Sequence, residues 1–244
     1  MRALYISAAT LVPMADISGS KVLVLGGSGV LGGLIATEIA QRGGKVALAG
    51  RSRARLRTRA EAIGSDTHVF VGDLVSPDVP ERIVGEAHDV LGGLDGLICA
   101  AGEVAFGPFR DLDDSVLERL TASNLTGPLR TIRSALGRIG SGGFVVGLTG
   151  AVVDTPTAGM AAYSSVKSGL SAALSAVARE ARRDGVYVLD ARPPHTETGL
   201  AERAIAGSAP ELPTGLDPAI VARTIVDAVE SGTRTLPPDA FKQE

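Results

Sequence analysis

The chain has 244 residues, a length that fits one large α/β domain better than two domains. The hydrophobic fraction of 45% provides for a sizeable core, and with no Trp and only 3% aromatic residues that core must consist of Ala, Val, Leu, Ile and Gly. The net charge of −3 at pH 7 argues against nucleic acid and membrane as partners, and the single Cys excludes an internal disulfide and favours a reduced, cytoplasmic compartment.

The first twenty residues differ in character from the rest of the chain. Arg2 precedes a short apolar run that Pro13 interrupts, and no clear cleavage site follows, so the match to a signal peptide is weak. We interpret residues 1–20 as a leader that is either disordered or the product of a start site placed too early. The folded domain is expected over residues 21–244, and no other run in the sequence is long and apolar enough to span a membrane.

From residue 21 onward, short apolar runs alternate with helical patterns. The runs predict seven strands, over 21–25, 45–50, 67–73, 94–102, 142–150 and 185–193, with a short last one over 233–238. Helices are predicted between them, over 30–43, 79–92, 158–180 and 217–232, with an Arg-rich helix after the second strand. A further long helix is predicted to begin at "DLDDS" (111–115), where Asp113 or Asp114 would cap it. Alternation at this spacing indicates βαβ units. We therefore predict a single-domain α/β fold with a Rossmann-like, doubly wound parallel sheet of about seven strands.

The stretch from 194 to 216 is a long irregular segment rich in Ala, Gly and Pro. It follows the end of a strand, where α/β sheets bind ligands, so we expect a flexible lid that closes water out of a substrate site. His195 within it either reaches the substrate or is a plain loop residue. No cluster of His, Cys and Asp has metal-ligand spacing, and no metal is expected.

A glycine-rich turn, "LGGSGVLGG" (25–33), lies between the first strand and the first helix. Its pattern is G-x-x-G-x-x-G, which lets the backbone turn tightly and approach a pyrophosphate at the helix N-terminus. The alternative is an ordinary tight turn. The residues of this turn expected to contact a dinucleotide are Gly26, Ser28, Gly29, Val30, Leu31 and Gly32.

The end of the second strand, "LAGRSR", predicts the type of dinucleotide. Gly50 occupies the place that carries an acid in NAD-preferring folds. An acid there would repel a 2′-phosphate, whereas Arg51 would bind one in bidentate fashion. We therefore predict NADP(H) as the cofactor, with Arg51 and Ser52 at its phosphate; the alternative is that Arg51 begins a solvated helix. The arginines at alternate positions over 51–59 scatter over two sides of a helix, so they do not indicate nucleic-acid binding.

Two further strand ends extend the predicted cofactor site. Asp73, followed by Leu74 in "VGDL", is expected near the adenine, or else serves as a turn carboxylate. The fourth strand closes with small residues that allow a flat ring to lie against the backbone: Ala100, Ala101 and Gly102.

The run "MAAYSSVKSG" (160–169) places Tyr163 four residues ahead of Lys167 in a predicted helix. Positions i and i+4 share a helix face, so the two side chains would point the same way. A phenol beside an ammonium makes an acid that works near neutral pH. The alternative is a surface pair on a helix.

With these motifs in place, the chain resembles the short-chain dehydrogenase/reductase family. The resemblance runs from Lys21 almost to the C-terminus and rests on the glycine loop, "AGR", "GDL", "CAAG", "NLTG" (124–127), Tyr163-x-x-x-Lys167 and "RPPHTET" (192–198). Each motif is weak alone, and their order and spacing are jointly specific. The resemblance implies an NADPH-dependent reductase of a ketone, aldehyde or enone, or the reverse alcohol oxidation, with a small-molecule substrate and a homodimer or homotetramer.

The resemblance also implies roles for individual residues. Tyr163 would donate a proton to the substrate carbonyl oxygen, and Lys167 would hold the nicotinamide ribose and stabilise the phenolate. Asn124 would anchor a water chain that feeds protons to Lys167, or else serves as a helix-kink or capping amide. The loop after the sixth strand would fix the nicotinamide carboxamide and the nearby phosphate through Pro193, Thr196 and Thr198.

Three positions depart from the family pattern. Gly150 stands where the second catalytic Ser belongs, Val30 replaces a loop Gly, and Pro194 stands where Gly is preferred. Thr149 can supply the missing hydroxyl only if the strand end twists or slips by one residue, because neighbours on a strand point to opposite faces. Losing one donor to a developing oxyanion costs about 10²–10³ in rate. The alternatives to carbonyl reduction are therefore a nucleotide-binding sensor with little turnover, or non-redox chemistry such as dehydration or epimerisation.

Overall fold

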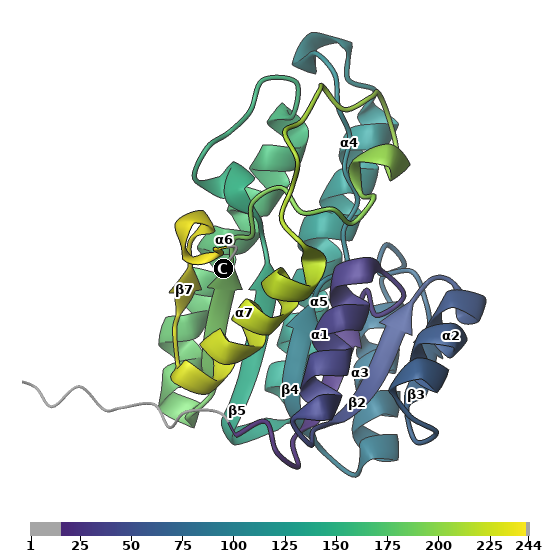
Figure 1. The fold of residues 1–244 in the computed structure, drawn as a ribbon, viewed down its shortest axis with the longest axis vertical. Coiled ribbons are helices and arrows are strands. Elements are labelled where there is room, and N and C mark those ends of the chain that lie inside the picture. The colour runs from purple at the N-terminus through teal and green to yellow at the C-terminus, as the bar shows by residue number, and fades with distance from the viewer. Residues whose placement is uncertain (1–15, 243–244) are drawn as a thin grey trace, which may run out of the picture.

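The computed structural model describes residues 16–242 of the chain. Seven strands form one sheet in the order β3-β2-β1-β4-β5-β6-β7, and every neighbouring pair is parallel (Figure 1). The predicted Rossmann-like α/β fold is confirmed. The strands are β1 (Lys21–Leu25), β2 (Lys45–Gly50), β3 (His68–Val71), β4 (Leu94–Cys99), β5 (Ile139–Leu148), β6 (Tyr187–Ala191) and β7 (Thr235–Leu236).

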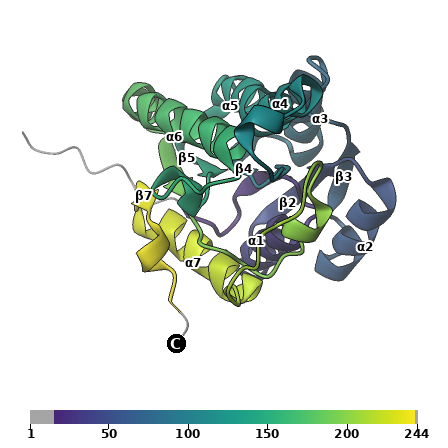
Figure 2. The same ribbon diagram turned by 90° about the horizontal axis from the view of Figure 1, so that it is seen from above.

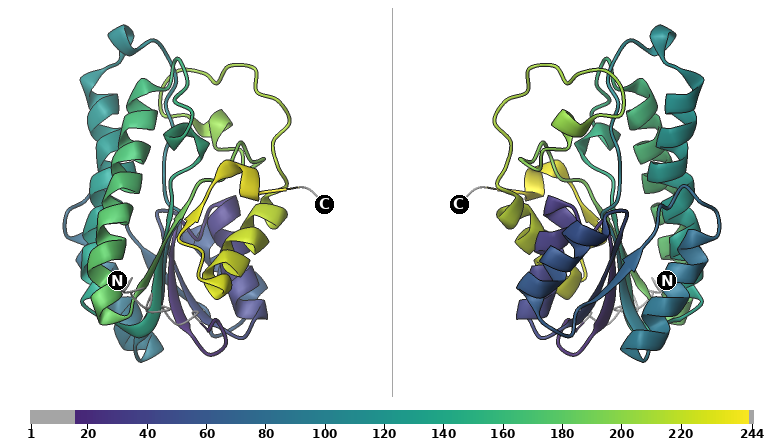
Figure 3. Two further views of the ribbon diagram at one scale, coloured as in Figure 1. Left: turned by 90° about the vertical axis from the view of Figure 1, so that its left-hand side faces the viewer. Right: turned by 90° about the vertical axis from the view of Figure 1, so that its right-hand side faces the viewer.

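The central strands are apolar on both faces because helices cover the sheet from both sides (Figures 2 and 3). In β1, each residue from Val22 to Leu25 is at most 1% exposed. One face packs against α1 (Val30–Gln41), α2 (Arg53–Ile63) and α7 (Pro218–Ser231), and the other against α3 (Val79–Leu91), α5 (Gly127–Leu136) and α6 (Ala161–Ala181). Within residues 16–242, no helix combines the length and the apolar character needed to cross a membrane.

The long helix predicted after the fourth strand is divided in two. It runs as α4 (Asp114–Thr121), a π-helical turn over Ala122–Thr126, and α5. Of the two candidate caps, Asp113 is the N-cap, because its Oδ1 accepts a hydrogen bond from the Ser115 amide at 2.7 Å. The π-helical turn places Asn124 in the interior, fully buried.

The segment predicted as a leader falls partly outside the described residues, since residues 1–15 are not among them. Ile17 is 0% exposed and belongs to the core beneath α1 and α7. The Gly19 amide donates to the Gly43 carbonyl at 3.0 Å. Packing against the sheet therefore already includes residues before Lys21.

The segment over 194–216 arches over the carboxyl ends of the strands (Figure 3). It contains a short 3₁₀ turn, Ala201–Arg203, and is tied to the loop after β4 by two backbone hydrogen bonds. The Ile205 amide donates to the Val104 carbonyl at 2.8 Å, and the Phe106 amide donates to the Ala206 carbonyl at 2.9 Å. The segment therefore covers the edge of the sheet at which the predicted site residues gather.

The contact between Phe144 and Gly96 gives a test of the core. These residues are register partners on β5 and β4, and a Cβ on Gly96 would lie 2.4 Å from the Phe144 ring. The ring is 1% exposed, so Phe144→Ala would leave a cavity and should lower the free energy of unfolding by about 3–5 kcal/mol. Phe109→Ala is the matched control, because Phe109 is 65% exposed and its loss should change stability by about 0.5 kcal/mol or less. Urea unfolding measures both, and equal losses would contradict this packing.

Candidate active site

A cleft of about 780 Å³ opens at the carboxyl ends of the strands. It lies at the point where the strand order reverses: the chain continues from β1 to β2 on one side of β1, whereas β4 is the neighbour of β1 on the other side. Ligands of open α/β sheets bind at such a switch point. All but two of the predicted site residues line the cleft, and the two that do not are Ser52 and Asn124.

The glycine loop is shaped for close approach of a ligand to the backbone. Gly26 has φ of 77°, and a Cβ there would lie 2.7 Å from the backbone of Ala100. A Cβ on Gly32 would lie 2.4 Å from the carbonyl oxygen of Gly26. No side chain fits at either position. Because α1 begins directly after this turn with no acidic residue in its first turn, the loop fits a pyrophosphate at the helix N-terminus.

The end of β2 presents Arg51 to the cleft, with its side chain 54% exposed. Ser52 instead caps α2, where its Oγ accepts from the Arg55 amide at 3.4 Å. Of the two residues predicted at the 2′-phosphate, Arg51 lines the cleft and Ser52 does not.

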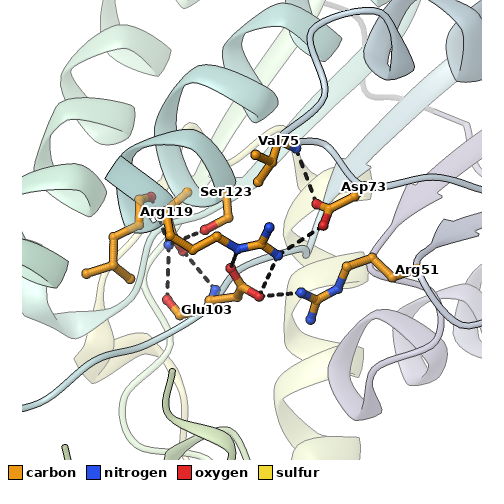
Figure 4. A network of polar contacts seen from close by, with 8 residues as sticks. Arg51, Asp73, Val75, Glu103, Arg119 and Ser123 are labelled. Carbon is orange, nitrogen blue, oxygen red and sulfur yellow. Dashed lines mark hydrogen bonds and ion pairs between the residues drawn. The ribbon is translucent and has the colours of Figure 1, made fainter. Parts of the chain in front are cut away.

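Asp73 belongs to a charged network in the same half of the cleft (Figure 4). Its Oδ2 pairs with Arg119 Nη2 at 3.0 Å, and its Oδ1 accepts from the Val75 amide at 3.2 Å. Arg119 also holds Glu103, and Glu103 pairs with Arg51. Burial alone would raise the pKa of Glu103, but hydrogen bonds and charge from Arg119, together with the charge of Arg51, outweigh it and hold that pKa below its usual range.

Glu103 and Arg119 were not predicted from the sequence. Glu103 directly follows "CAAG", the motif that marks the end of the fourth strand. An acidic residue directly after a strand end that was predicted to line the cofactor site could have indicated that Glu103 belongs to the site. Arg119 lies on α4, and only the folded chain brings it to the strand ends.

Tyr163 and Lys167 face the same cleft from α6. Lys167 Nζ lies 5.8 Å from the centre of the Tyr163 ring and donates to the Leu148 carbonyl at 2.9 Å. Burial lowers the pKa of Lys167 to about 8, while the charge of Asp190 acts in the opposite direction. Burial also raises the pKa of Tyr163 to about 12. The phenol is therefore protonated at neutral pH and has a proton to donate.

Asn124 braces the loop after β4. Its Nδ2 donates to the carbonyls of Glu103 at 3.0 Å and Leu120 at 3.1 Å, and its Oδ1 accepts from the Glu103 amide at 3.2 Å. A Cβ on Gly102 would lie 2.7 Å from Asn124 Oδ1 and 3.3 Å from Lys167 Nζ. The amide and the ammonium are thus neighbours across Gly102.

Thr149 does not offer a free hydroxyl at the end of β5. The residue is 1% exposed, and its Oγ1 donates to Asp190 Oδ1 at 2.5 Å. Gly150 has φ of 92°, a backbone conformation that favours glycine, so a serine at this position would be strained. The strand end therefore directs the Thr149 hydroxyl to Asp190.

Asp190 is a buried carboxylate that gathers several donors behind the cleft. It is 4% exposed and accepts from Ser171 Oγ of α6 at 2.6 Å and from Arg192 Nε at 2.9 Å, in addition to Thr149. Arg192 also pairs with Asp154 at 2.6 Å. This network joins β5, β6 and the helix that carries Tyr163. The sequence prediction missed it, although an acid inside the apolar run "VYVLDA" was a signal.

The loop after β6 completes the lining with Pro193, Thr196 and Thr198. Thr196 Oγ1 donates to the Pro194 carbonyl at 2.8 Å. His195 also lines the cleft, with its Nε2 3.6 Å from Glu197 Oε1. In the part of the chain that the structure describes, no group of three or more His, Cys, Asp or Glu side chains is placed to hold a metal ion.

The sheet order and the glycine cradle define a dinucleotide-binding α/β protein, and comparison with known proteins refines that class. The family model described as short chain dehydrogenase matches residues 20–208. The chain therefore belongs to the short-chain dehydrogenase family, whose members are oxidoreductases that use NAD(P)(H).

Individual relatives agree with this family. An uncharacterized oxidoreductase of Staphylococcus haemolyticus is 25% identical over 88% of this chain and 93% of its own. The 3-ketodihydrosphingosine reductase of Bos taurus is 31% identical over 76% of this chain, which spans only 59% of that protein's length. A short chain dehydrogenase from Burkholderia cenocepacia, solved in complex with NADP, shares the fold with a TM-score of 0.83, 24% identity and coverage of 92% of this chain and 98% of that one.

The position of Asp190 predicts a measurable effect on Lys167. Asp190→Asn removes a negative charge that favours the ammonium, so the pKa of Lys167 should fall below about 8. Because buried donors lose their anionic partner, the free energy of unfolding should also fall, by about 1–3 kcal/mol. Titration of the Lys167 ¹³Cε resonance in ¹³C-lysine-labelled protein measures this pKa.

Thr149→Val is the matched control for this titration. It removes one hydrogen bond to Asp190 and keeps the charge, so stability should fall by about 1 kcal/mol while the pKa of Lys167 stays in place. An unchanged pKa in Asp190→Asn would show that Asp190 does not act on Lys167.

Proposed function

We propose that the protein uses NADPH to reduce the carbonyl group of an apolar ketone, aldehyde or enone, or oxidises the corresponding alcohol in reverse. The observation that carries the proposal is the convergence of the glycine cradle with Tyr163 and Lys167 in one cleft. The end of β2 carries Gly50 and Arg51 in place of an acid, and the Arg51 guanidinium in the cleft supports NADPH over NADH.

In this proposal the chain binds and orients the reactants and moves one proton. The glycine loop and the N-terminus of α1 hold the pyrophosphate, and Thr196 and Thr198 hold the nicotinamide end. Bound NADPH supplies the hydride to the carbonyl carbon. Tyr163 gives its hydroxyl proton to the carbonyl oxygen, which yields the alcohol, and the Lys167 ammonium stabilises the phenolate that remains.

The substrate part of the cleft supports an apolar substrate. Its walls come from the loop after β4, the segment before α6 and the segment over 194–216. The apolar residues among them include Phe106, Val152, Met160, Ile205 and Leu212. The name of the bovine relative, 3-ketodihydrosphingosine reductase, denotes reduction of a ketone and agrees with this substrate class.

The test of the proposed function is Tyr163→Phe assayed by NADPH consumption over a library of carbonyl compounds. Because the phenol supplies the proton, the variant should lose about 10²–10⁴ in rate and keep NADPH binding within about twofold. Tyr187→Phe is the matched control, since the Tyr187 hydroxyl donates to the carbonyls of Ala228 in α7 and of Thr233 just after it, and Tyr187 lies outside the cleft lining. Turnover that Tyr163→Phe leaves intact would contradict the proton-donor role, and substrate loss without NADPH consumption would point to non-redox chemistry.

The choice of cofactor is tested separately with Arg51→Ala. Hydrogen bonds to charged groups contribute about 1.5–3 kcal/mol, so the variant should weaken NADPH binding about tenfold or more. NADH, which carries a 2′-hydroxyl, should lose much less. Fluorescence titration with each reduced cofactor measures both dissociation constants, and equal losses would refute the assignment of Arg51 to the 2′-phosphate.

A further inference from the structure

The ion pair between Arg51 and Glu103 spans the cleft across the end of β1. Arg51 follows β2 and Glu103 follows β4, the two strands that flank β1 in the sheet. Since neighbouring strands lie about 4.8 Å apart, the two backbones are about 10 Å apart at this edge. The glycine loop begins at Gly26 between them, and all three residues line the same cleft. The ion pair therefore lies across the predicted path of the dinucleotide.

Glu103 is held firmly on its other side by Arg119 (Figure 4). Arg119 Nε lies 2.6 Å from Glu103 Oε2, and Arg119 Nη2 lies 2.9 Å from Glu103 Oε1, a two-pronged contact of the strong kind. The Glu103 side chain is only 9% exposed, and its backbone is fixed by Asn124. Glu103 therefore keeps a partner and a fixed position when Arg51 moves.

Arg51 is the mobile half of the pair. Its side chain is 54% exposed, against 30% for Arg119. Ion pairs with one well-solvated partner contribute little to stability, so another anion can replace the carboxylate at modest cost. A 2′-phosphate, with a charge of about −1.5 to −2, is such an anion, whereas a 2′-hydroxyl is not.

We propose that Glu103 tunes cofactor specificity by competing with the 2′-phosphate of NADPH for the Arg51 guanidinium. This inference rests on the proposed function, in which Arg51 binds that phosphate. To bind, NADPH must draw Arg51 away from Glu103 and place its 2′-phosphate near the Glu103 carboxylate. NADH leaves the ion pair between Arg51 and Glu103 intact. Glu103 thus weakens NADPH binding selectively and limits the preference that Arg51 creates.

The experiment titrates the Glu103→Gln variant with NADPH and with NADH at fixed low ionic strength. Cofactor fluorescence reports the binding and gives each dissociation constant. Glutamine keeps the size of the side chain and removes the charge, so the NADPH dissociation constant should fall about two- to fivefold. The NADH constant should stay within about twofold. Glu86→Gln is the matched control: it removes the same charge from an exposed ion pair with Arg82 on α3, away from the cleft lining, and should change neither constant.

Two further variants keep the test decisive. Glu103→Asp retains the charge beside Arg119 but is too short to span the cleft, so it should shift NADPH binding in the same direction by a smaller factor. In an Arg51→Ala background, Glu103→Gln should lose most of its effect on NADPH binding, because the guanidinium for which Glu103 and the 2′-phosphate compete is absent. Thermal unfolding of each cofactor-free variant verifies that it is folded.

The outcomes separate this inference from the proposed function. Wild-type protein that binds neither cofactor, or an Arg51→Ala variant that loses affinity for both equally, would overturn both. Wild-type protein that prefers NADPH, with a ratio of dissociation constants that Glu103→Gln leaves unchanged, would overturn the role of Glu103 alone. Weaker NADH binding in Glu103→Gln would also overturn it, since the carboxylate would then contact the ribose hydroxyls directly.

Discussion

The parallel direction of all seven strands is the constraint on which the site depends. It brings every strand's carboxyl end to one edge of the sheet, and the change of direction between β1 and β4 leaves a crevice there. Gly26 and Gly32 keep that crevice open to a ligand, because a side chain at either position would collide with backbone. Residues distant in the sequence, such as Arg51 and Lys167, line one cleft for this reason.

The helix that carries Tyr163 and Lys167 is fixed to the sheet by buried polar contacts. Ser171 of α6 binds Asp190 of β6, and Lys167 donates to the end of β5. Burial disfavours the charged form of Lys167, and the neighbouring carboxylate of Asp190 offsets part of that cost. The same carboxylate that locates the helix therefore also acts on the charge of the ammonium.

The sequence predicted those features that are local in the chain. Alternation of apolar runs and helical patterns located the strands, and the glycine spacing located the cradle. The i, i+4 spacing placed Tyr163 and Lys167 on one face. Contacts between strand ends could not be predicted in this way. The pairing of Glu103 with Arg119 depends on where the fold places α4 relative to the end of β4. The interior place of Asn124 depends on a π-helical turn, which no local residue preference marks.

Two charged networks divide the cleft between them, and their burial gives them different consequences. Arg51, Glu103, Arg119 and Asp73 form one network. The Arg51 side chain is 54% exposed, so its ion pair can exchange partners, whereas Arg119 is 30% exposed and holds Glu103 by two contacts. The second network is centred on Asp190, whose side chain is 4% exposed, and separating a buried charge from its partners is costly. An exchangeable network suits a site that must admit and release a charged ligand. In the proposed function, a fixed network suits the position of Tyr163, from which a proton would be delivered, since a small displacement there would misalign donor and acceptor.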